Sequence, residues 1–306
     1  DGAATTTAPS LLFAVSSDGD VIQAIAITAA HLFAVGRTSE SGNGAWRIEK
    51  RLLSDGSLDS SFGTAGVVTS NPGSSGDVPF AVALDSTSLY VAGMDSTVGH
   101  AQWRIEKRSQ TDGSLVIAFG SGGIVTSNPS SVENTAYGIV IDSTAIYVVG
   151  SDHVPGNGEW RIEKRALTDG TLVSAFGTGG VVTSNPTSAG DFPYAVALDS
   201  TSLYIAGRDI TGGVSEWRIE KRTLSDGALV SSFGTGGVVT QAVSGGGEIN
   251  ALALDATSLY AAGYDTSPGN VQWRIEKLNL GDGALDSAFG ASGVITTNPS
   301  SSGDVP

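Results

Sequence analysis

The sequence predicts an all-β fold, a five-bladed β-propeller of four-stranded antiparallel blades with a period of about 57 residues, and three observations support it. The pentapeptide WRIEK occurs five times in the 306 residues, at intervals of 57, 57, 57 and 56. Each interval contains four short apolar runs separated by turn-forming residues, and none shows a helical periodicity. A four-stranded unit has two apolar faces, which neighbouring units around an axis can cover. A parallel β-helix is the main alternative, although its coils are normally shorter.

The second unit illustrates the first two expected strands. The apolar run at 79–85 predicts a strand that is covered on both faces. A turn follows at 85–87, because Asp, Ser and Thr side chains hydrogen-bond to their own backbone. The run at 89–95 predicts the second strand. Its Gly93 recurs in every unit, which indicates a bulge or a close approach of another part of the chain.

The other two strands follow in the same unit. The third is expected at 102–108, where Trp103 and Arg104 point to opposite faces. An Asp-Gly turn at 112–113 and a Phe-Gly pair then lead to a short fourth strand at 123–128. The units differ mostly in the loops between the second and third strands, at 38–45, 95–102, 152–159, 209–216 and 265–272.

This period divides the chain into an N-terminal segment, 1–19, and a five-repeat region, 20–306. The blades are expected at about 20–76, 77–133, 134–190, 191–246 and 247–303. The N-terminal segment contains a surplus apolar strand at 10–15, whose outward contacts would come from Leu11, Leu12, Phe13 and Val15. This strand can lie on the edge of the last blade or pair with another copy of the chain, and head-to-tail pairing that does not close produces fibres.

The residues LDSSFGTAGVV at 58–68 resemble the delta-60 repeat, a bacterial family of predicted propeller blades with the core L-D-x-x-F-G-x-x-G-x-V. The FG-x-x-G part is present in all five units, whereas its Asp is kept only at Asp59 and Asp286. The resemblance covers nearly the whole chain beyond about residue 20. It implies a propeller repeat, but no activity or catalytic residue, because the family has none in common.

Composition restricts the classes of partner and the compartment. A net charge of −15 argues against nucleic acid, which requires clustered Lys and Arg. The chain has no Cys, and no apolar run reaches the length of a membrane span. A start at Asp1 followed by small polar residues suggests an exported, processed protein or a trimmed chain. Abundant Gly, Ser and Thr with little Lys favours an extracellular or cell-surface location.

Two groups of repeated residues are candidates for a role. Five Trp at one repeat position could stack on sugars, but we expect them to pack between blades. They are Trp46, Trp103, Trp160, Trp217 and Trp273. An Arg and a Glu two residues apart share one face of each third strand and could serve as acid and base. Because catalysis needs one asymmetric arrangement, five equal copies predict a structural ion-pair network instead.

Acids at the loop ends of the first two strands form the candidate binding residues. They are Asp77, Asp95, Asp152, Asp191, Asp209 and Asp265, with Asp20, Glu133 and Glu248 nearby. Such carboxylates could hold Ca²⁺ or hydroxyl-rich ligands, although no Ca²⁺-loop motif is present and a solvated acidic face is the expected state. The three His occupy unrelated repeat positions, so no metal site or other cofactor is predicted from them.

These observations favour a secreted, non-enzymatic β-propeller that serves as a structural or adhesive module. Self-assembly through the surplus strand would make copies of the chain its partners. A lectin-like propeller that binds extracellular glycans with the acidic loops is the alternative. A glycosidase is less favoured, because the variable loops gather no obvious pair of catalytic carboxylates.

Overall fold

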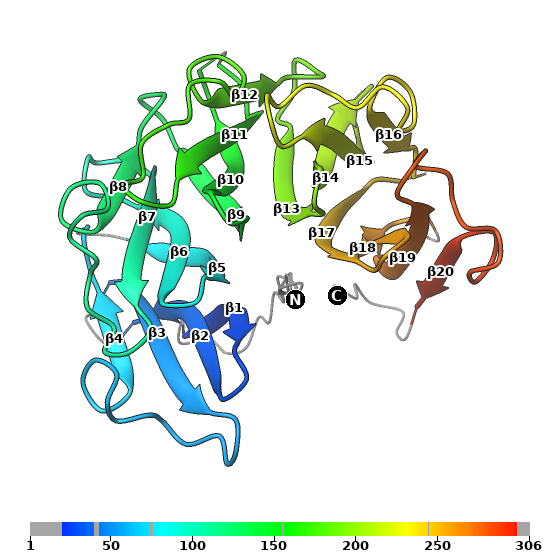
Figure 1. Ribbon diagram of the computed structural model, residues 1–306. Helices are drawn as coiled ribbons and strands as arrows, with labels where there is room; N and C mark the ends of the chain where they lie inside the picture. The colour runs from blue at the N-terminus through cyan, green and yellow to red at the C-terminus, as the bar shows by residue number, and fades with distance from the viewer. Residues whose placement is uncertain are drawn as a thin grey trace. The chain divides into compact units, whose positions relative to one another are not determined.

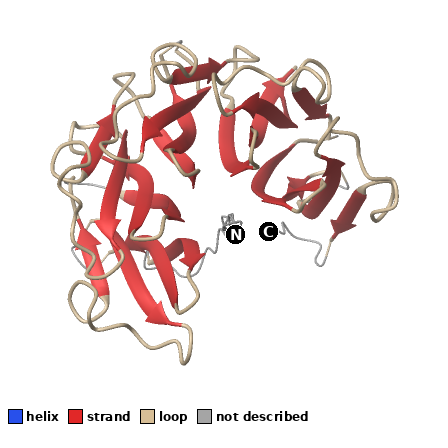
Figure 2. Ribbon diagram, viewed as in Figure 1, coloured by secondary structure: helices blue, strands red, loops and turns tan. Residues whose placement is uncertain are grey.

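The computed structural model describes residues 20–39, 43–73, 76–154, 156–243, 245–267 and 269–298. These residues contain only strands, turns and loops (Figure 2), in agreement with the all-β prediction. The surplus strand expected at 10–15 lies outside the described residues. Twenty strands form five four-stranded sheets in which consecutive strands are neighbours.

The strands of the five sheets are labelled in Figure 1. The first sheet contains β1 (Val21–Ile27), β2 (His31–Thr38), β3 (Ala45–Leu52) and β4 (Val67–Ser70). The second contains β5 (Val78–Leu84), β6 (Ser88–Asp95), β7 (Gln102–Ser109) and β8 (Ile124–Ser127). The third contains β9 (Thr135–Ile141), β10 (Ala145–Asp152), β11 (Glu159–Ala166) and β12 (Val181–Ser184). The fourth contains β13 (Phe192–Leu198), β14 (Ser202–Thr211), β15 (Val214–Thr223) and β16 (Val238–Gln241). The fifth contains β17 (Gly247–Leu254), β18 (Ser258–Asp265), β19 (Gln272–Asn279) and β20 (Val294–Thr297).

The four strands predicted in each repeat are therefore confirmed, with one difference in the fourth sheet. Here the expected loop at 209–216 is largely strand, because β14 and β15 extend to a two-residue turn. That turn is Gly212-Gly213, and both residues have positive φ, the conformation that a tight hairpin turn requires. The five antiparallel sheets are those expected of five propeller blades, and we call them blades one to five.

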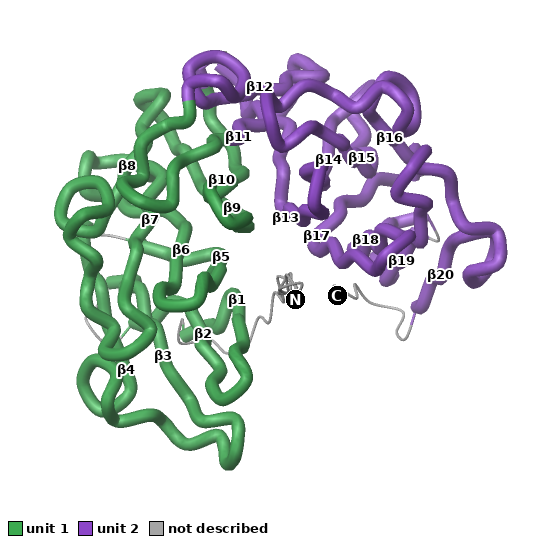
Figure 3. Tube along the Cα trace, viewed as in Figure 1, with its two compact units in different colours: residues 1–153, 163–173 green, residues 154–162, 174–306 purple. Residues whose placement is uncertain are grey.

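The chain divides into two compact units (Figure 3), residues 1–153 with 163–173 and residues 154–162 with 174–306. The division passes through the third blade. Every contact between blades that is described below joins residues of one unit.

The recurrent strand glycine has the close approach that its position predicts. A Cβ on Gly93 would lie 2.2 Å from the carbonyl oxygen of Val78 and 3.0 Å from the indole of Trp46. The pairing of β5 with β6 shifts register between Pro79 and Ala81, so the first strand bulges opposite this glycine. A larger residue at Gly93 would collide with the backbone of the first strand of its own blade and press on the indole of Trp46 in the preceding blade.

Candidate functional site: the junction between blades

The indole N–H of each buried Trp donates a hydrogen bond to a main-chain carbonyl of the following blade. The pairs are Trp46 with Met94 (3.1 Å), Trp103 with Ser151 (3.0 Å), Trp160 with Arg208 (3.2 Å) and Trp217 with Tyr264 (2.9 Å). In every pair the acceptor is the residue directly after the recurrent strand glycine. All four Trp are at most 1 % exposed, so each indole combines a large apolar contact with a satisfied polar group.

The Phe-Gly and Asp-Gly motifs of adjacent repeats meet at the same junction. The glycine N–H of each Phe-Gly pair donates to the carbonyl of the Asp in the next blade. The pairs are Gly63 with Asp112, Gly120 with Asp169, Gly177 with Asp226 and Gly234 with Asp282, at 2.8–2.9 Å. The glycine after that Asp provides space, since a Cβ on Gly113 would lie 2.6 Å from Val68 and 3.0 Å from the ring of Phe62. These two short motifs are therefore the two halves of one contact.

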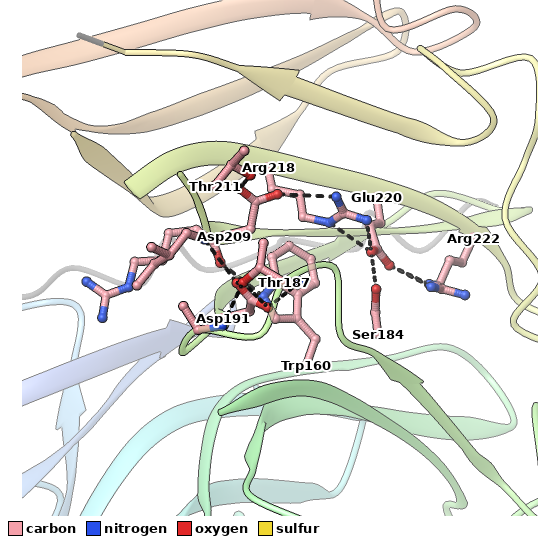
Figure 4. A network of polar contacts seen from close by, with 12 residues as sticks. Trp160, Ser184, Thr187, Asp191, Asp209, Thr211, Arg218, Glu220 and Arg222 are labelled. Carbon is pink, nitrogen blue, oxygen red and sulfur yellow. Dashed lines mark hydrogen bonds and ion pairs between the residues drawn. The ribbon is translucent and has the colours of Figure 1, made fainter. Parts of the chain in front are cut away.

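A buried ion-pair network forms the third part of the junction, and Figure 4 shows it around Glu220. Arg218 and Arg222 of the same strand donate to the two carboxylate oxygens of Glu220 at 2.8 and 2.7 Å. The hydroxyl of Ser184, on the preceding blade, donates to Glu220 at 2.6 Å. Burial alone would raise the pKa of Glu220, but Arg222, Arg218 and Ser184 hold it below its usual range. Ser70 with Glu106 and Ser127 with Glu163 repeat the contact between blades.

The donor half of this junction is more exposed in blade five than in the other blades. Its Trp273 is 43 % exposed and Ile295 is 37 % exposed, whereas the other four Trp are buried. Phe289 is half-buried, although the four equivalent Phe are fully buried. We call this surface the outgoing face of blade five and define it by Trp273, Phe289, Gly290, Ile295 and Thr297.

The acceptor half of the junction is likewise more exposed in blade one than in the other blades. Ile22 is 52 % exposed, and a Cβ on Gly56 would meet no atom within 4 Å. The side chain of Glu49 is 15 % exposed, compared with 0 % for Glu106. We call this surface the incoming face of blade one and define it by Ile22, Arg37, Glu49, Asp55 and Gly56.

The six candidate binding acids are buried rather than solvated, which corrects the expectation of an acidic, water-exposed face. Asp77, Asp95, Asp152, Asp191, Asp209 and Asp265 are at most 2 % exposed. Asp77 accepts hydrogen bonds from the N–H groups of Gly73 (2.8 Å) and Ser96 (2.9 Å). Asp191 accepts from the hydroxyl of Thr187 at 2.9 Å, a contact drawn in Figure 4, and from the N–H of Ile210 at 3.0 Å. These carboxylates fix the loops that connect one blade to the next.

The acids at the end of the second strand contact the third strand of their own blade. Asp265 accepts from the amide of Gln272 at 2.8 Å and from Arg274 at 3.2 Å. Burial opposes ionisation of Asp265, but Gln272, the Ser267 N–H and Arg274 hold its pKa below the usual range. Burial raises the pKa of Asp209, against the opposing charge of Arg218.

Glu276 of blade five lacks two partners that Glu106, Glu163 and Glu220 have. Leu278 replaces the second Arg, and Gln241 of blade four replaces the Ser of the preceding blade. Arg274 donates twice to one carboxylate oxygen, at 2.8 and 2.6 Å, while the other oxygen is buried and has no hydrogen-bond partner. Burial raises the pKa of Glu276, although Arg274 opposes this. Blade five therefore carries an incomplete copy of the ion-pair network.

Restoring the missing cation is expected to favour the folded chain more near pH 7 than in acid. Leu278→Arg would give the free oxygen of Glu276 a charged donor, a contact worth about 1.5–3 kcal/mol near pH 7, and it would also remove a fully buried Leu, a loss that does not depend on pH. The pKa of Glu276 is raised in the folded state, so its charge lowers the free energy of unfolding above that pKa. This effect disappears as the pH falls and the carboxylate becomes protonated. The gain from Leu278→Arg should therefore shrink in acid. Urea unfolding at several pH values measures this change, with Leu278→Met as control; the same pH dependence in both variants would contradict this assignment.

One cluster in the described residues departs from the repeat and was not predicted. Arg208 pairs with Glu248 at 3.1 Å, and its guanidinium lies 5.0 Å from the ring centroid of Phe192. The ring of Tyr194 is nearly parallel to that of Phe192, at 6.3 Å. Burial raises the pKa of Glu248, against the opposing effects of Arg208, Tyr194 and Tyr264. No clear signal in the sequence indicated this cluster, because the position of Arg208 varies among the blades and also carries an Arg in blade one.

The described residues show no group of three or more His, Cys, Asp or Glu that could hold a metal ion. His31 lies 3.4 Å from Asp59, and His100 hydrogen-bonds to Asn128 at 2.9 Å. The described part of the chain contains no helix that is long and apolar enough to cross a membrane.

Comparison with known proteins supports the class of fold. Residues 31–62 match the model of a family described as "Domain of unknown function (DUF5122) beta-propeller". The match runs from β2 through β3 to Phe62, and so contains the first WRIEK and the Phe of the Phe-Gly pair that follows it. Together with the five antiparallel sheets, it indicates a repeat of the β-propeller type; the narrower resemblance to the delta-60 repeat stays a prediction. No curated protein matches the chain.

Proposed function

We propose that this β-propeller chain is a secreted, non-enzymatic structural or adhesive module that assembles head to tail with copies of itself. The observation that carries the proposal is the repeated junction, in which one blade packs on the next through the same contacts. Four Trp donors are buried against a following blade in this way. A repeat of this kind contacts only its neighbours, so a further copy can be added through the same type of contact.

The chemistry of the described polar residues also supports a structural role. The repeated Arg and Glu side chains neutralise one another, and the candidate loop acids accept hydrogen bonds from the protein itself. An acid–base catalyst needs a group that can reach a substrate, whereas these groups are buried.

The predicted five-bladed ring and head-to-tail assembly make different use of the outgoing and incoming faces. A ring would use them within one chain, and assembly uses them between chains. Residues 10–15 supply the other predicted route, by strand addition to a blade edge.

Particle mass and shape test the proposal. Sedimentation and electron microscopy of the full chain should show particles that grow with protein concentration, and a matched sample without residues 1–19 separates the strand route from the blade route. A full chain that stays monomeric at every concentration excludes assembly.

Glycan binding is the second candidate, and the cluster of Phe192, Tyr194, Arg208 and Glu248 is what favours it. Half-exposed aromatic faces beside a charged pair offer stacking and hydrogen bonds to a sugar. A glycan array, with and without Ca²⁺, should show signals that Phe192→Ala abolishes and that Phe80→Ala, in another blade, leaves intact. An array without signal in both conditions removes this candidate.

A further inference from the structure

We infer that Asn157–Gly158 is a site of spontaneous chemical modification, at which deamidation releases a loop of blade three from the connector that leads into blade four. The connector is the segment 185–191, between β12 and β13. The inference goes beyond the proposed function, because it concerns the chemistry of one loop and does not require assembly. The loop and the connector belong to the same compact unit.

The side-chain amide of Asn157 holds the connector in place. Its Nδ2 donates to the side-chain oxygen of Asn185 at 3.0 Å and to the main-chain carbonyl oxygens of Ala189 at 2.7 Å and Thr187 at 3.3 Å. All three partners are acceptors. The contact therefore requires a donor at position 157, which an amide supplies and an ionised carboxylate does not.

The glycine that follows Asn157 favours the reaction. The main-chain nitrogen of Gly158 can attack Cγ of Asn157, because glycine has no side chain to obstruct the approach and has a wide choice of backbone conformations. The N–Cγ bond forms, the Cγ–Nδ2 bond breaks, and Nδ2 leaves as ammonia with the proton that the Gly158 nitrogen loses. Water then opens the succinimide ring at either carbonyl and gives aspartate or isoaspartate.

The repeat supplies matched copies of this loop. Asn270 of blade five makes the equivalent side-chain pair, since its Nδ2 donates to the side-chain oxygen of Asn298 at 3.0 Å. The residue after it is Val271, whose stiff, branched side chain obstructs the attack. Blade one carries the glycine form again, as Asn43–Gly44. One chain therefore contains both a reactive and an unreactive form of the same loop.

Deamidation acts on the connector in two ways. The new carboxylate faces the carbonyl oxygen of Ala189, so the hydrogen bonds that the amide donated are lost. Isoaspartate also adds one carbon to the main chain directly before Gly158, whose carbonyl oxygen accepts the N–H of Asp191 at 2.8 Å. Asp191 is buried and accepts the N–H of Ile210 at 3.0 Å. The modification therefore reaches a buried contact at the start of blade four.

The hydrogen bonds of the amide also set the rate of the reaction. Nδ2 must leave its acceptors before Cγ can turn towards the Gly158 nitrogen, so the reaction proceeds from an opened loop. A hydrogen bond of ordinary strength favours the closed loop by a factor of about five. Asn185→Ala is therefore expected to deamidate about five times faster at Asn157 than the parent chain. Ala242 occupies the equivalent position in blade four, so Ala is compatible with this site.

Peptide mapping by mass spectrometry of the full chain, incubated at physiological temperature and pH, tests the site. Isoaspartate and aspartate should accumulate at position 157 and not at position 270. Gly158→Val, which copies blade five, should abolish the modification, and Val271→Gly should create it at Asn270. Hydrogen exchange at the N–H of Asp191 measures release of the connector, and it should be about fivefold faster in the modified chain for each hydrogen bond lost.

Each arm can overturn the inference. Equal amounts of isoaspartate at positions 157 and 270 would mean that the following residue does not control the reaction. An Asn157 that stays intact in both the parent chain and Asn185→Ala would exclude the modification. Modified chains with unchanged exchange at Asp191 would exclude release of the connector. None of these results bears on self-assembly, so failure here is distinct from failure of the proposed function.

Discussion

Replacing Trp103 with Ala is expected to lower the free energy of unfolding by about 3–5 kcal/mol, the usual cost of removing a buried Trp from a core. Its indole is fully buried and donates to the carbonyl of Ser151, so the change leaves both a cavity and an unsatisfied acceptor. Urea unfolding of the purified variant measures the loss.

Trp273→Ala is the matched control, because it removes the same side chain at the same repeat position. At protein concentrations where the chain is monomeric its effect should be below about 1 kcal/mol, since surface substitutions are usually within about 0.5 kcal/mol. Similar losses for both variants would show that Trp273 is covered like the others.

Replacing Glu220 with Gln is expected to destabilise the chain by about 3–5 kcal/mol, because it leaves Arg218 and Arg222 buried without their shared counterion. Their side chains are only 12 % and 8 % exposed. The pKa of Glu220 is depressed in the folded state, so its contribution is present at neutral pH. This contribution to the free energy of unfolding should be lost as the pH falls through the depressed pKa of Glu220, which lies below the ordinary value of 4.5.

Glu49→Gln is the control for this network. Arg47 and Arg51 are 29 % and 39 % exposed, so water can solvate them when Glu49 loses its charge. A loss of about 1 kcal/mol or less is expected, as for exposed ion pairs. Chemical unfolding of both variants between pH 4 and 7 gives the comparison. Equal losses would mean that the junction does not bury the network.

The repeated features of the fold could be predicted from the sequence. Apolar runs, Asp-Gly turns and the glycine at Gly93 located four strands in each unit, because each of these signals acts over a few residues. The pairing of Gly63 with Asp112 was not predicted, since two motifs of separate repeats meet only when blades pack. The loop acids were expected to be exposed to water, but main-chain N–H groups bind them, as those of Gly73 and Ser96 bind Asp77. Every residue except Pro has such a group, so the sequence does not indicate which ones will face a carboxylate.

The candidate site was harder to predict because it depends on position in the chain. Trp217 and Trp273 stand in the same pentapeptide, yet one is buried and the other is 43 % exposed. The pentapeptide itself does not distinguish them, because its five residues are the same in both blades. The pairing of Arg208 with Glu248 was missed for a related reason, since the two residues lie in different blades and meet across a junction.

The five Trp permit one direct measurement, ¹⁹F NMR of the chain labelled with 5-fluorotryptophan, with Trp273→Phe to assign the fifth signal. We expect four signals that an added paramagnetic quencher does not broaden at any concentration. The fifth should be broadened in dilute samples and become protected as the protein concentration rises. A Trp273 signal that stays broadened at every concentration, or is protected even in the most dilute sample, would contradict assembly of copies through the junction between blades.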